Sequence, residues 1–317
     1  MFLGIDTSCY TTSIAVVNEQ EELILEKRQL LNVSEGSKGL PQSEALFHHL
    51  KRLPDLLDEA GQSFCYSRIK AVCSSTVPRP DKASYMPVFV VSERFGKTIS
   101  LLFKIPYFTV SHQENHLRSG LWSANLRKKC FLAIHLSGGT TELLKVYWDG
   151  GRFSIKVLGG TLDINAGQFI DRVGVKLGLP FPAGPYLEDM AKYGQELLHI
   201  PSWVKDYTVS FSGPETAAIR YINQNKKPHD IARSVENTVA KTIEKLLRKA
   251  IKDENINEVL LVGGVIANNY VREKLKSRLE HQAVGGRLYF ATPQHSGDNA
   301  IGNALIARDR YLNQHHT

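Results

Sequence analysis

The feature that most constrains the fold is an order of three strands and two turns that occurs twice in the sequence. The strands of the first copy are at 2–6, 12–17 and 23–30, and those of the second copy are at 131–136, 142–148 and 154–158. In each copy a short polar loop follows the first strand, at 6–12 and at 137–141. Short apolar runs bounded by turn residues are typical of β-strands. An internal duplication is the economical explanation, and two facing halves would place both loops at one cleft, where ligands often bind.

The remaining pattern alternates helices with strands and predicts an α/β protein. Further strands are expected at 69–74, 256–262 and 287–291, and helices at 43–60, 88–103, 166–177, 231–252, 269–279 and 298–311. Ser43 is expected to cap the first of these helices, with Leu50 on its apolar face. A chain of 317 residues is too long for one ordinary core, so we expect two domains of comparable size.

Composition narrows the class of protein. The sequence has no run of eighteen apolar residues and no signal-peptide pattern, so we expect a cytoplasmic protein without a membrane partner. A formal charge of +7 gives a mild preference for polyanions such as tRNA, although most basic clusters are solvated helix faces. The four cysteines contain no Cys-x-x-Cys pair and predict free, mostly buried thiols.

Two histidines four residues apart, His112 and His116, are the first candidate for a site with chemistry. If the segment is helical, both imidazoles lie on one face and can bind one metal ion. A third ligand is then required, and Asp298 is a candidate if the last helix begins there and returns to the first half. Spacing alone favours the alternative, an ordinary pair on an amphipathic helix.

The loops and glycine pairs are candidates for ligand binding. Asp6 stands at the end of the first strand, where a carboxylate can orient a metal or a water, and the nearby Ser8 hydroxyl can help to hold a phosphate. The order strand, glycine pair and helix at 256–279 lets the backbone approach a phosphate or nucleoside closely. Asn268 in this segment can bind a nucleoside, cap the following helix, or do both.

Seven segments in the same order together resemble the TsaD family, the tRNA adenosine threonylcarbamoyltransferases once called glycoproteases. The resemblance covers nearly the whole chain and is far more specific than one glycine loop. The segments are Gly-Ile-Asp-Thr-Ser-Cys at 4–9, His-Gln-Glu-Asn-His-Leu at 112–117, Leu-Ser-Gly-Gly-Thr-Thr at 136–141, Gly-Thr-Leu-Asp at 160–163 continuing to Asp171, Ser-Phe-Ser-Gly at 210–213, Gly-Gly-Val-Ile-Ala-Asn at 263–268, and Gly-Asp-Asn-Ala at 297–300.

The resemblance implies an actin-like ATPase (ASKHA) fold, in which two duplicated RNase H-like domains face a nucleotide cleft. The first domain would span 1–117, with the C-terminal helix at 298–313 packing back on it. The second would span 118–297 and carry inserted helices.

The resemblance also implies which residues form the site. One iron or zinc ion would be held by His112, His116 and Asp298, and Asp6 and Ser8 would be the catalytic residues. An adenine nucleotide (ATP, AMP or an acyl-adenylate) would be bound by the remaining positions, which are Ser137, Gly138, Gly139, Asp171, Gly184 and Asn268. Asp171 would accept hydrogen bonds from the ribose hydroxyls; the alternative is an ion pair with Arg172 or Lys176 on the helix surface.

The implied reaction moves a threonylcarbamoyl group from threonylcarbamoyl-AMP to the tRNA adenosine next to the anticodon. The metal would polarise the carbonyl, and the site would position both reactants without a covalent enzyme intermediate. The implied partners are tRNA, a small ASKHA partner subunit and an ATPase subunit.

Several positions depart from the family pattern, which leaves two alternatives. An acidic pair is replaced by Tyr10 and Thr11, a histidine by Thr140, a Gly-Pro-Gly loop by residues 77–81, a small residue by Asn115, Leu-Lys by Pro214 and Glu215, and a glutamate and an aspartate by Gln168 and Ile164. A divergent paralogue could bind nucleotide and metal but act on another acceptor. A non-catalytic partner subunit is the other alternative, and the retained metal ligands argue against it.

Overall fold

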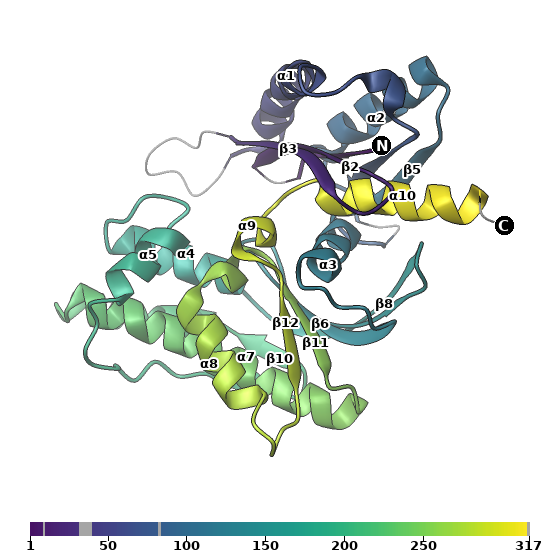
Figure 1. Ribbon diagram of the computed structural model, residues 1–317. Coiled ribbons are helices and arrows are strands. Elements are labelled where there is room, and N and C mark those ends of the chain that lie inside the picture. The colour runs from purple at the N-terminus through teal and green to yellow at the C-terminus, as the bar shows by residue number, and fades with distance from the viewer. Residues whose placement is uncertain (9, 32–39, 82–83, 316–317) are drawn as a thin grey trace.

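The computed structural model describes residues 1–8, 10–31, 40–81 and 84–315, and these form two sheets with helices packed on their faces (Figure 1). The first sheet has the strand order β3-β2-β1-β4-β5. Its strands are β1 Phe2–Asp6, β2 Thr11–Val17, β3 Leu23–Leu30, β4 Ala71–Val77 and β5 Tyr107–Ser111. The first three are antiparallel and the last two add in parallel, so the expected N-terminal meander is confirmed.

The second sheet repeats this arrangement. Its strands are β6 Cys130–Leu136, β7 Thr141–Trp148, β8 Phe153–Thr161, β11 Glu258–Val262 and β12 Arg287–Phe290, with β9 Trp203–Lys205 and β10 Thr208–Ser210 added at the β8 edge. The order β12-β11-β6-β7-β8 is that of the first sheet read from the other edge, and the antiparallel and parallel pairs correspond. The internal duplication is therefore confirmed.

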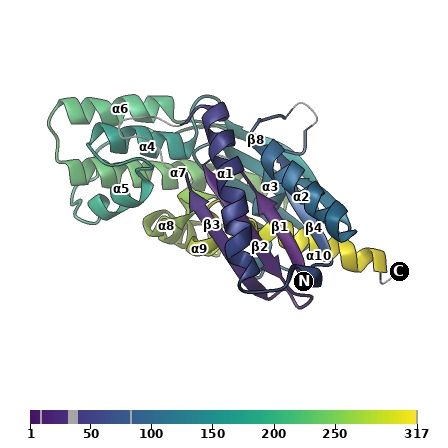
Figure 2. The ribbon, with the colours of Figure 1, turned by 90° about the horizontal axis from the view of Figure 1, so that it is seen from above.

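Helices cover both faces of the first sheet. Helices α1 Gln42–Gly61 and α2 Phe89–Phe103 lie on one face, and α10 Ile301–His315 lies on the other (Figure 2). Because strand residues alternate between faces, Leu3 and Ile5 contact α1 and α2, whereas Phe2 contacts α10.

Two details of α1 differ from expectation. Pro41, and not Ser43, takes the N-cap position, so the helix begins before the predicted cap, and no side chain of the described residues caps it. Leu50 was expected on the apolar face but is 47% exposed, because the buried face runs through Ala45, His49, Leu53 and Leu56.

The second sheet is also covered on both faces. Its larger core lies under α4 Ala166–Lys176, α5 Gly184–Ala191, α6 Ser212–Asn223, α7 Pro228–Glu254 and α8 Asn269–Leu279. The opposite face packs on α3 His112–Ser123 through Leu117 and Leu121. Three short helices complete the fold, η1 Tyr66–Arg68, η2 Gly264–Ala267 and α9 Pro293–Ser296.

Helices α3 and α10 cross between the two sheets. Helix α3 follows the last strand of the first sheet but packs on the second sheet, whereas α10 follows the last strand of the second sheet and packs on the first (Figure 1). The expected domain boundary between residues 117 and 118 falls inside α3. The expectation that Asp298 begins the last helix is wrong, because α10 begins at Ile301 and Asp298 lies in the loop after α9.

Two further observations bear on composition. Cys65, Cys73 and Cys130 are free, but only Cys73 is buried, so the expectation of mostly buried thiols is wrong for these three; Cys9 lies outside the described residues. Cys65 precedes the short helix η1 and Cys130 begins β6, and both positions are open to solvent. Within the described ranges, the helices are all too short or too polar to span a bilayer.

Candidate metal centre and nucleotide site

Helix α3 presents the two histidines because its N-terminus is closed by a capping box. The Ser111 hydroxyl accepts a hydrogen bond from the Glu114 amide at 3.2 Å, and the Glu114 carboxylate accepts one from the Ser111 amide at 2.7 Å. His112 is therefore the first helical residue, and His116 follows one turn later on the same face. The segment is thus helical, as a shared metal site for the two imidazoles requires, and both side chains are buried.

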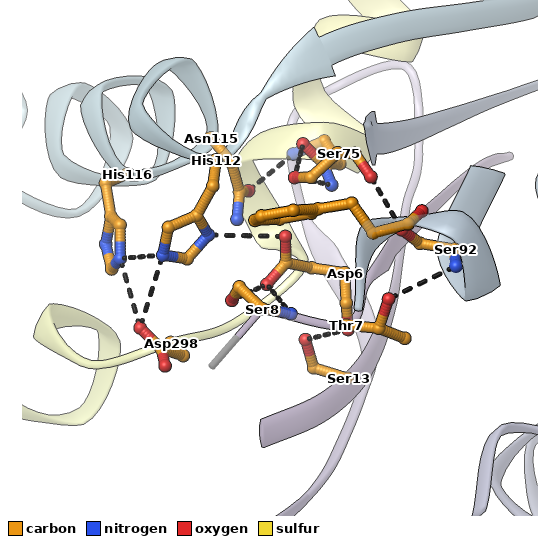
Figure 3. A network of polar contacts seen from close by, with 12 residues as sticks. Asp6, Thr7, Ser8, Ser13, Ser75, Ser92, His112, Asn115, His116 and Asp298 are labelled. Carbon is orange, nitrogen blue, oxygen red and sulfur yellow. Dashed lines mark hydrogen bonds and ion pairs between the residues drawn. The ribbon is translucent and has the colours of Figure 1, made fainter. Parts of the chain in front are cut away.

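The loop before α10 brings Asp298 to the two histidines (Figure 3). The Nε2 atoms of His112 and His116 lie 3.0 Å apart. Asp298 Oδ1 is 3.4 Å from His112 Nε2 and 3.2 Å from His116 Nε2. Ligand atoms bonded to one ion at about 2.1 Å are about 3.0 Å apart in octahedral geometry and about 3.4 Å apart in tetrahedral geometry. The three separations match this range, so these residues fit one divalent metal ion.

Asp6 holds His112 from the other side. Its Oδ1 lies 3.3 Å from His112 Nδ1, and its Oδ2 accepts a hydrogen bond from the Ser8 hydroxyl (Figure 3). A carboxylate on the second ring nitrogen fixes the tautomer and orientation of a metal-binding histidine. Asp6 and Ser8 are both fully buried, and Ser8 is linked to His112 through Asp6.

Without a metal, these groups share charge. Burial alone would lower the pKa of His112, but Asp6 and Asp298 raise it to about 10. Burial and the positive His112 lower the pKa of His116. Burial alone would raise the pKa of Asp298, but its hydrogen bonds with both histidines hold it below the usual range. One proton thus occupies the histidine pair between two carboxylates, and a divalent ion replacing that proton would leave the group neutral.

His135 is a buried polar residue that was not singled out from the sequence. It lies on β6, and its ring centroid is 4.7 Å from that of His116. Burial and the nearby His116 lower its pKa well below the ordinary value. A signal was available, because Phe131, Ala133 and His135 alternate onto the sheet face that α3 covers.

The glycine loop after β6 meets the N-terminus of α4. Gly138 and Gly139 are exposed, and the amide of Gly139 donates to the Ser137 hydroxyl at 3.2 Å. A Cβ at Gly167, in the first turn of α4, would come within 2.6 Å of the Gly138 nitrogen. The helix N-terminus therefore lies directly against the loop, an arrangement that favours anions such as phosphate.

Asp171 joins α4 to α5. Its Oδ1 accepts a hydrogen bond from the Ala183 amide at 2.8 Å, and burial raises its pKa. The surface ion pair considered for Asp171 is not formed with Arg172, whose guanidinium is 3.3 Å from Glu215. Asp171 and Gly184 are thereby brought together, and the glycine loop lies at the N-terminus of α4.

Asn268 caps helix α8, which is one of the two roles expected for it. Its side-chain oxygen accepts a hydrogen bond from the Val271 amide at 2.8 Å, and its amide group donates to Glu236 at 2.5 Å. Burial raises the pKa of Glu236 to about 7. On α5, Glu188 accepts a hydrogen bond from the Asn269 amide at 2.8 Å, so the α5 and α8 N-terminal regions are joined. Glu188 and Glu236 are not among the residues predicted from the sequence.

Two of the departing positions make contacts between the halves. Tyr10 lies edge-on to Phe181, with ring centroids 6.3 Å apart. Arg79 lies 2.7 Å from Glu142 on β7, which also accepts a hydrogen bond from Gln113 of α3.

Asn115, another of the departing positions, lies in the sequence between the two candidate metal-binding histidines. Its amide group donates to the Asn299 carbonyl at 2.5 Å, and its oxygen accepts from the Asn303 amide at 2.9 Å. Asn115 therefore fixes α3 to the loop and helix that carry Asp298.

The paired sheets and crossing helices define an actin-like ATPase fold. An activator of 2-hydroxyisocaproyl-CoA dehydratase from Clostridium difficile with bound ADPNP superposes with a TM-score of 0.59 at 16% identity, covering 100% of this chain and 98% of that one. Full-length HypF in a phosphate- and nucleotide-bound form superposes with a TM-score of 0.61 at 15% identity, covering 97% of this chain and 46% of that one. At these identities the similarity shows the fold alone.

Sequence comparison then shows the family. The family model described as "TsaD: tRNA N6-adenosine threonylcarbamoyltransferase" matches residues 33–305. The protein of that name from Archaeoglobus fulgidus is 31% identical over 315 residues, which cover 99% of this chain and 93% of the relative. Its counterpart from Thermotoga neapolitana is also 31% identical, over 98% of this chain and 93% of the relative. The chain belongs to the TsaD family, so the family resemblance seen in the sequence and the predicted fold are both confirmed.

Proposed function

We propose that the protein transfers a threonylcarbamoyl group from threonylcarbamoyl-AMP to the tRNA adenosine next to the anticodon. The observation that carries the proposal is the meeting of His112, His116 and Asp298 at ligand distances, in a chain that belongs to the TsaD family. The ion would be iron or zinc, because imidazole nitrogen with carboxylate oxygen suits both.

Residues of the second half would bind the adenylate. Gly138 and Gly139 would offer backbone amides to its phosphate beside the N-terminus of α4. Asp171 would accept from the ribose hydroxyls, with Gly184 and Asn268 completing the adenosine site. The hydrogen bonds that join α4, α5 and α8 support this role, since they hold these positions without a ligand.

The remaining residues would orient the reacting groups. A metal bound here would polarise the carbonyl of the transferred group. Asp6 would hold His112 in the ligating tautomer, and Ser8 would hold Asp6. Fixing the adenylate beside the entering adenosine removes much of the entropic cost of bringing two reactants together.

We also propose the division into a domain of residues 1–117 with the helix at 298–313 and a domain of residues 118–297. Its support is that each sheet has its own core and that α10 packs on the first sheet. Small-angle scattering with and without nucleotide would test whether the two domains move relative to each other. An unchanged scattering curve would count against the division.

Partner subunits would bind the first domain in this proposal. The C-terminal end of α2 exposes Leu101 and Leu102 by 70% and 75%, and α1 exposes Phe47 by 51%. These apolar side chains would suit a small ASKHA subunit, with the ATPase subunit binding the resulting pair. Leu102→Glu should abolish co-purification with the small subunit, and retained binding would place the contact elsewhere.

The transfer itself is tested by reconstitution. The mixture contains threonine, bicarbonate, ATP, the synthase that makes the adenylate, and tRNA with the target adenosine, and the tRNA is digested and examined by mass spectrometry. We expect the modified nucleoside with the wild type and a loss of at least about 100-fold in His116→Ala, because a metal ligand is gone. Unmodified tRNA, with metal and adenine nucleotide both bound to the protein, would instead indicate another acceptor.

A further inference from the structure

A carboxyl group buried in the second half of the molecule lies beside the proposed adenosine site. Glu236 is on helix α7, and its side chain is only 1% exposed. Burying a carboxyl group costs free energy unless it is hydrogen-bonded, and burial raises the pKa of Glu236 to about 7. The proposed transfer gives this group no role, so its burial in this place calls for an explanation.

Both oxygens of Glu236 have hydrogen-bond partners. Oε1 accepts from the side-chain amide of Asn268 at 2.5 Å, and Oε2 accepts from the guanidinium of Arg233 at 2.7 Å. Arg233 lies one turn earlier on α7 and is itself held over the ring of Tyr270, with its guanidinium carbon 4.4 Å from the ring centroid. The carboxyl group is thus fixed on α7 while it bonds the residue that begins α8.

These contacts decide which way the Asn268 amide faces. As the N-cap of α8, its Oδ1 accepts a hydrogen bond from the Val271 backbone amide at 2.8 Å. A backbone N–H only donates and a carboxylate only accepts, so the oxygen of Asn268 faces Val271 and its nitrogen faces Glu236. The opposite orientation would set two oxygens against each other, and two N–H groups likewise. One N–H and one lone pair of the amide stay available for a ligand.

We propose that Glu236 is a positioning residue that fixes the amide of Asn268 for adenine nucleotide binding. The inference rests on the nucleotide site proposed above, and Glu236 acts on the nucleotide only through Asn268. A binding group that is already held in one orientation loses less conformational freedom when its ligand arrives. The next residue is held in a similar way, because Glu188 of α5 accepts from the Asn269 amide at 2.8 Å.

Titration calorimetry of the full-length protein with AMP tests the proposal. Glu236→Ala removes the acceptor that holds the Asn268 nitrogen, so AMP should bind at least about 10-fold more weakly. Asn237→Ala is the matched control, because Asn237 is the next residue on α7 and also bonds α8, accepting from the Tyr270 hydroxyl at 3.2 Å. Its AMP affinity should equal that of the wild type. Equal AMP affinity in the wild type and Glu236→Ala overturns the proposal.

A double-mutant cycle separates positioning of the amide from a general loss of structure. Asn268→Ser keeps an N-cap side chain for α8 but removes the amide. In this background, Glu236→Ala should leave AMP affinity nearly unchanged, because its route to the nucleotide is already gone. Equal losses of affinity from Glu236→Ala with and without Asn268→Ser would mean that Glu236 does not act through the amide, and would overturn the proposal.

The wild type gives a test that does not depend on a variant folding. NMR of protein carrying isotopically labelled asparagine reports hydrogen exchange of the Asn268 side-chain amide without nucleotide. We expect at least one protected proton, because exchange requires the bond to Glu236 to open. Rapid exchange of both protons, or a wild type that binds no AMP, overturns the proposal. A confirmed role of Glu236 without tRNA modification would overturn the proposed transfer reaction alone.

Discussion

Asp6 connects the first polar loop to the candidate metal ligands, and its effect on His112 is electrostatic as well as geometric. In Asp6→Asn the side chain keeps its shape and can still accept from His112 Nδ1, but the negative charge is lost. We expect zinc affinity to fall about 10- to 100-fold, since outer partners of ligating histidines contribute this much. Chelator competition measures the change.

Ser13→Ala is the control for this variant, because the Ser13 hydroxyl donates to the Asp6 backbone carbonyl at 3.3 Å and not to its carboxylate. Its affinity should equal that of the wild type. An Asp6→Asn protein that binds zinc as tightly as Ser13→Ala would show that the carboxylate does not support the site.

The shared proton predicts a pH dependence of the metal-free protein. Asp6 and Asp298 raise the pKa of His112 to about 10, above the ordinary 6.5 of an unfolded chain. A raised histidine pKa adds stability that is full below pH 6.5 and is lost as the pH rises through 10. The metal-free wild type should therefore lose on the order of a few kcal/mol of unfolding free energy between pH 6 and pH 9.5.

Urea unfolding of the wild type and of His112→Gln at both pH values isolates this contribution. The glutamine cannot take up the proton, so the variant should change less with pH than the wild type. Parallel changes in the two proteins would assign the pH dependence to other groups.

The residues in and around the candidate metal site were predictable from the sequence to different degrees. The four-residue spacing of His112 and His116 suggested one helix face, and the capping box of α3 bears this out. Asp298 could be proposed only from the ordered motifs, because it lies far away in the chain. His135 was overlooked, since a single histidine in an apolar strand looks like a core residue until the covering helix is known.

At the scale of elements, the close approach of α3 and α10 sets the geometry of the site. A Cβ at Gly302 would overlap the backbone carbonyl oxygen of Asn115, so α10 can lie against α3 only with glycine there. Gly302→Ala should cost about 1–3 kcal/mol of unfolding free energy, because overpacking forces the helices apart. It should also weaken zinc binding, since Asn115 lies between His112 and His116.

Gly213→Ala is the matched control for this prediction. Gly213 lies in the first turn of α6, and among the described residues no atom comes within 4 Å of a Cβ built there. Alanine at such an open helical position is neutral or stabilises by up to about 1 kcal/mol. Urea unfolding compares the two variants, and equal stability would mean that α3 and α10 tolerate a wider separation.

Element prediction succeeded where local signals were strong. Helix α8 begins and ends as expected because Asn268 is an N-cap in sequence and in structure. The start of α10 was missed by three residues because the Asn299 side chain bonds the local backbone, donating to the Gly297 carbonyl and accepting from the Ile301 amide. The contacts of Tyr10 with Phe181 and of Arg79 with Glu142 join distant segments, which periodicity cannot reveal.

At the scale of the whole molecule, a buried ion network joins the first sheet to both crossing helices. Arg118 on α3 lies 2.7 Å from Asp309 on α10 and 2.7 Å from Glu21 in the turn between β2 and β3. Arg308 adds a second contact to each carboxylate, at 3.2 Å to Glu21 and 2.7 Å to Asp309. Burial alone would raise the pKa of Glu21, but Arg118 and Arg308 lower it, so the carboxylate stays charged.

Removing Arg118 would leave two largely buried carboxylates with too little positive charge around them. The side chain of Arg118 is 6% exposed, and those of Glu21 and Asp309 are 16% and 6% exposed, so water compensates only in part for a lost guanidinium. We expect Arg118→Ala to lose about 3–5 kcal/mol of unfolding free energy in urea. Arg127→Ala removes a partner of Glu21 whose side chain is 72% exposed, and it should lose no more than about 1 kcal/mol. Similar losses of unfolding free energy in both variants would mean that the buried position of Arg118 adds no stability to its ion pairs.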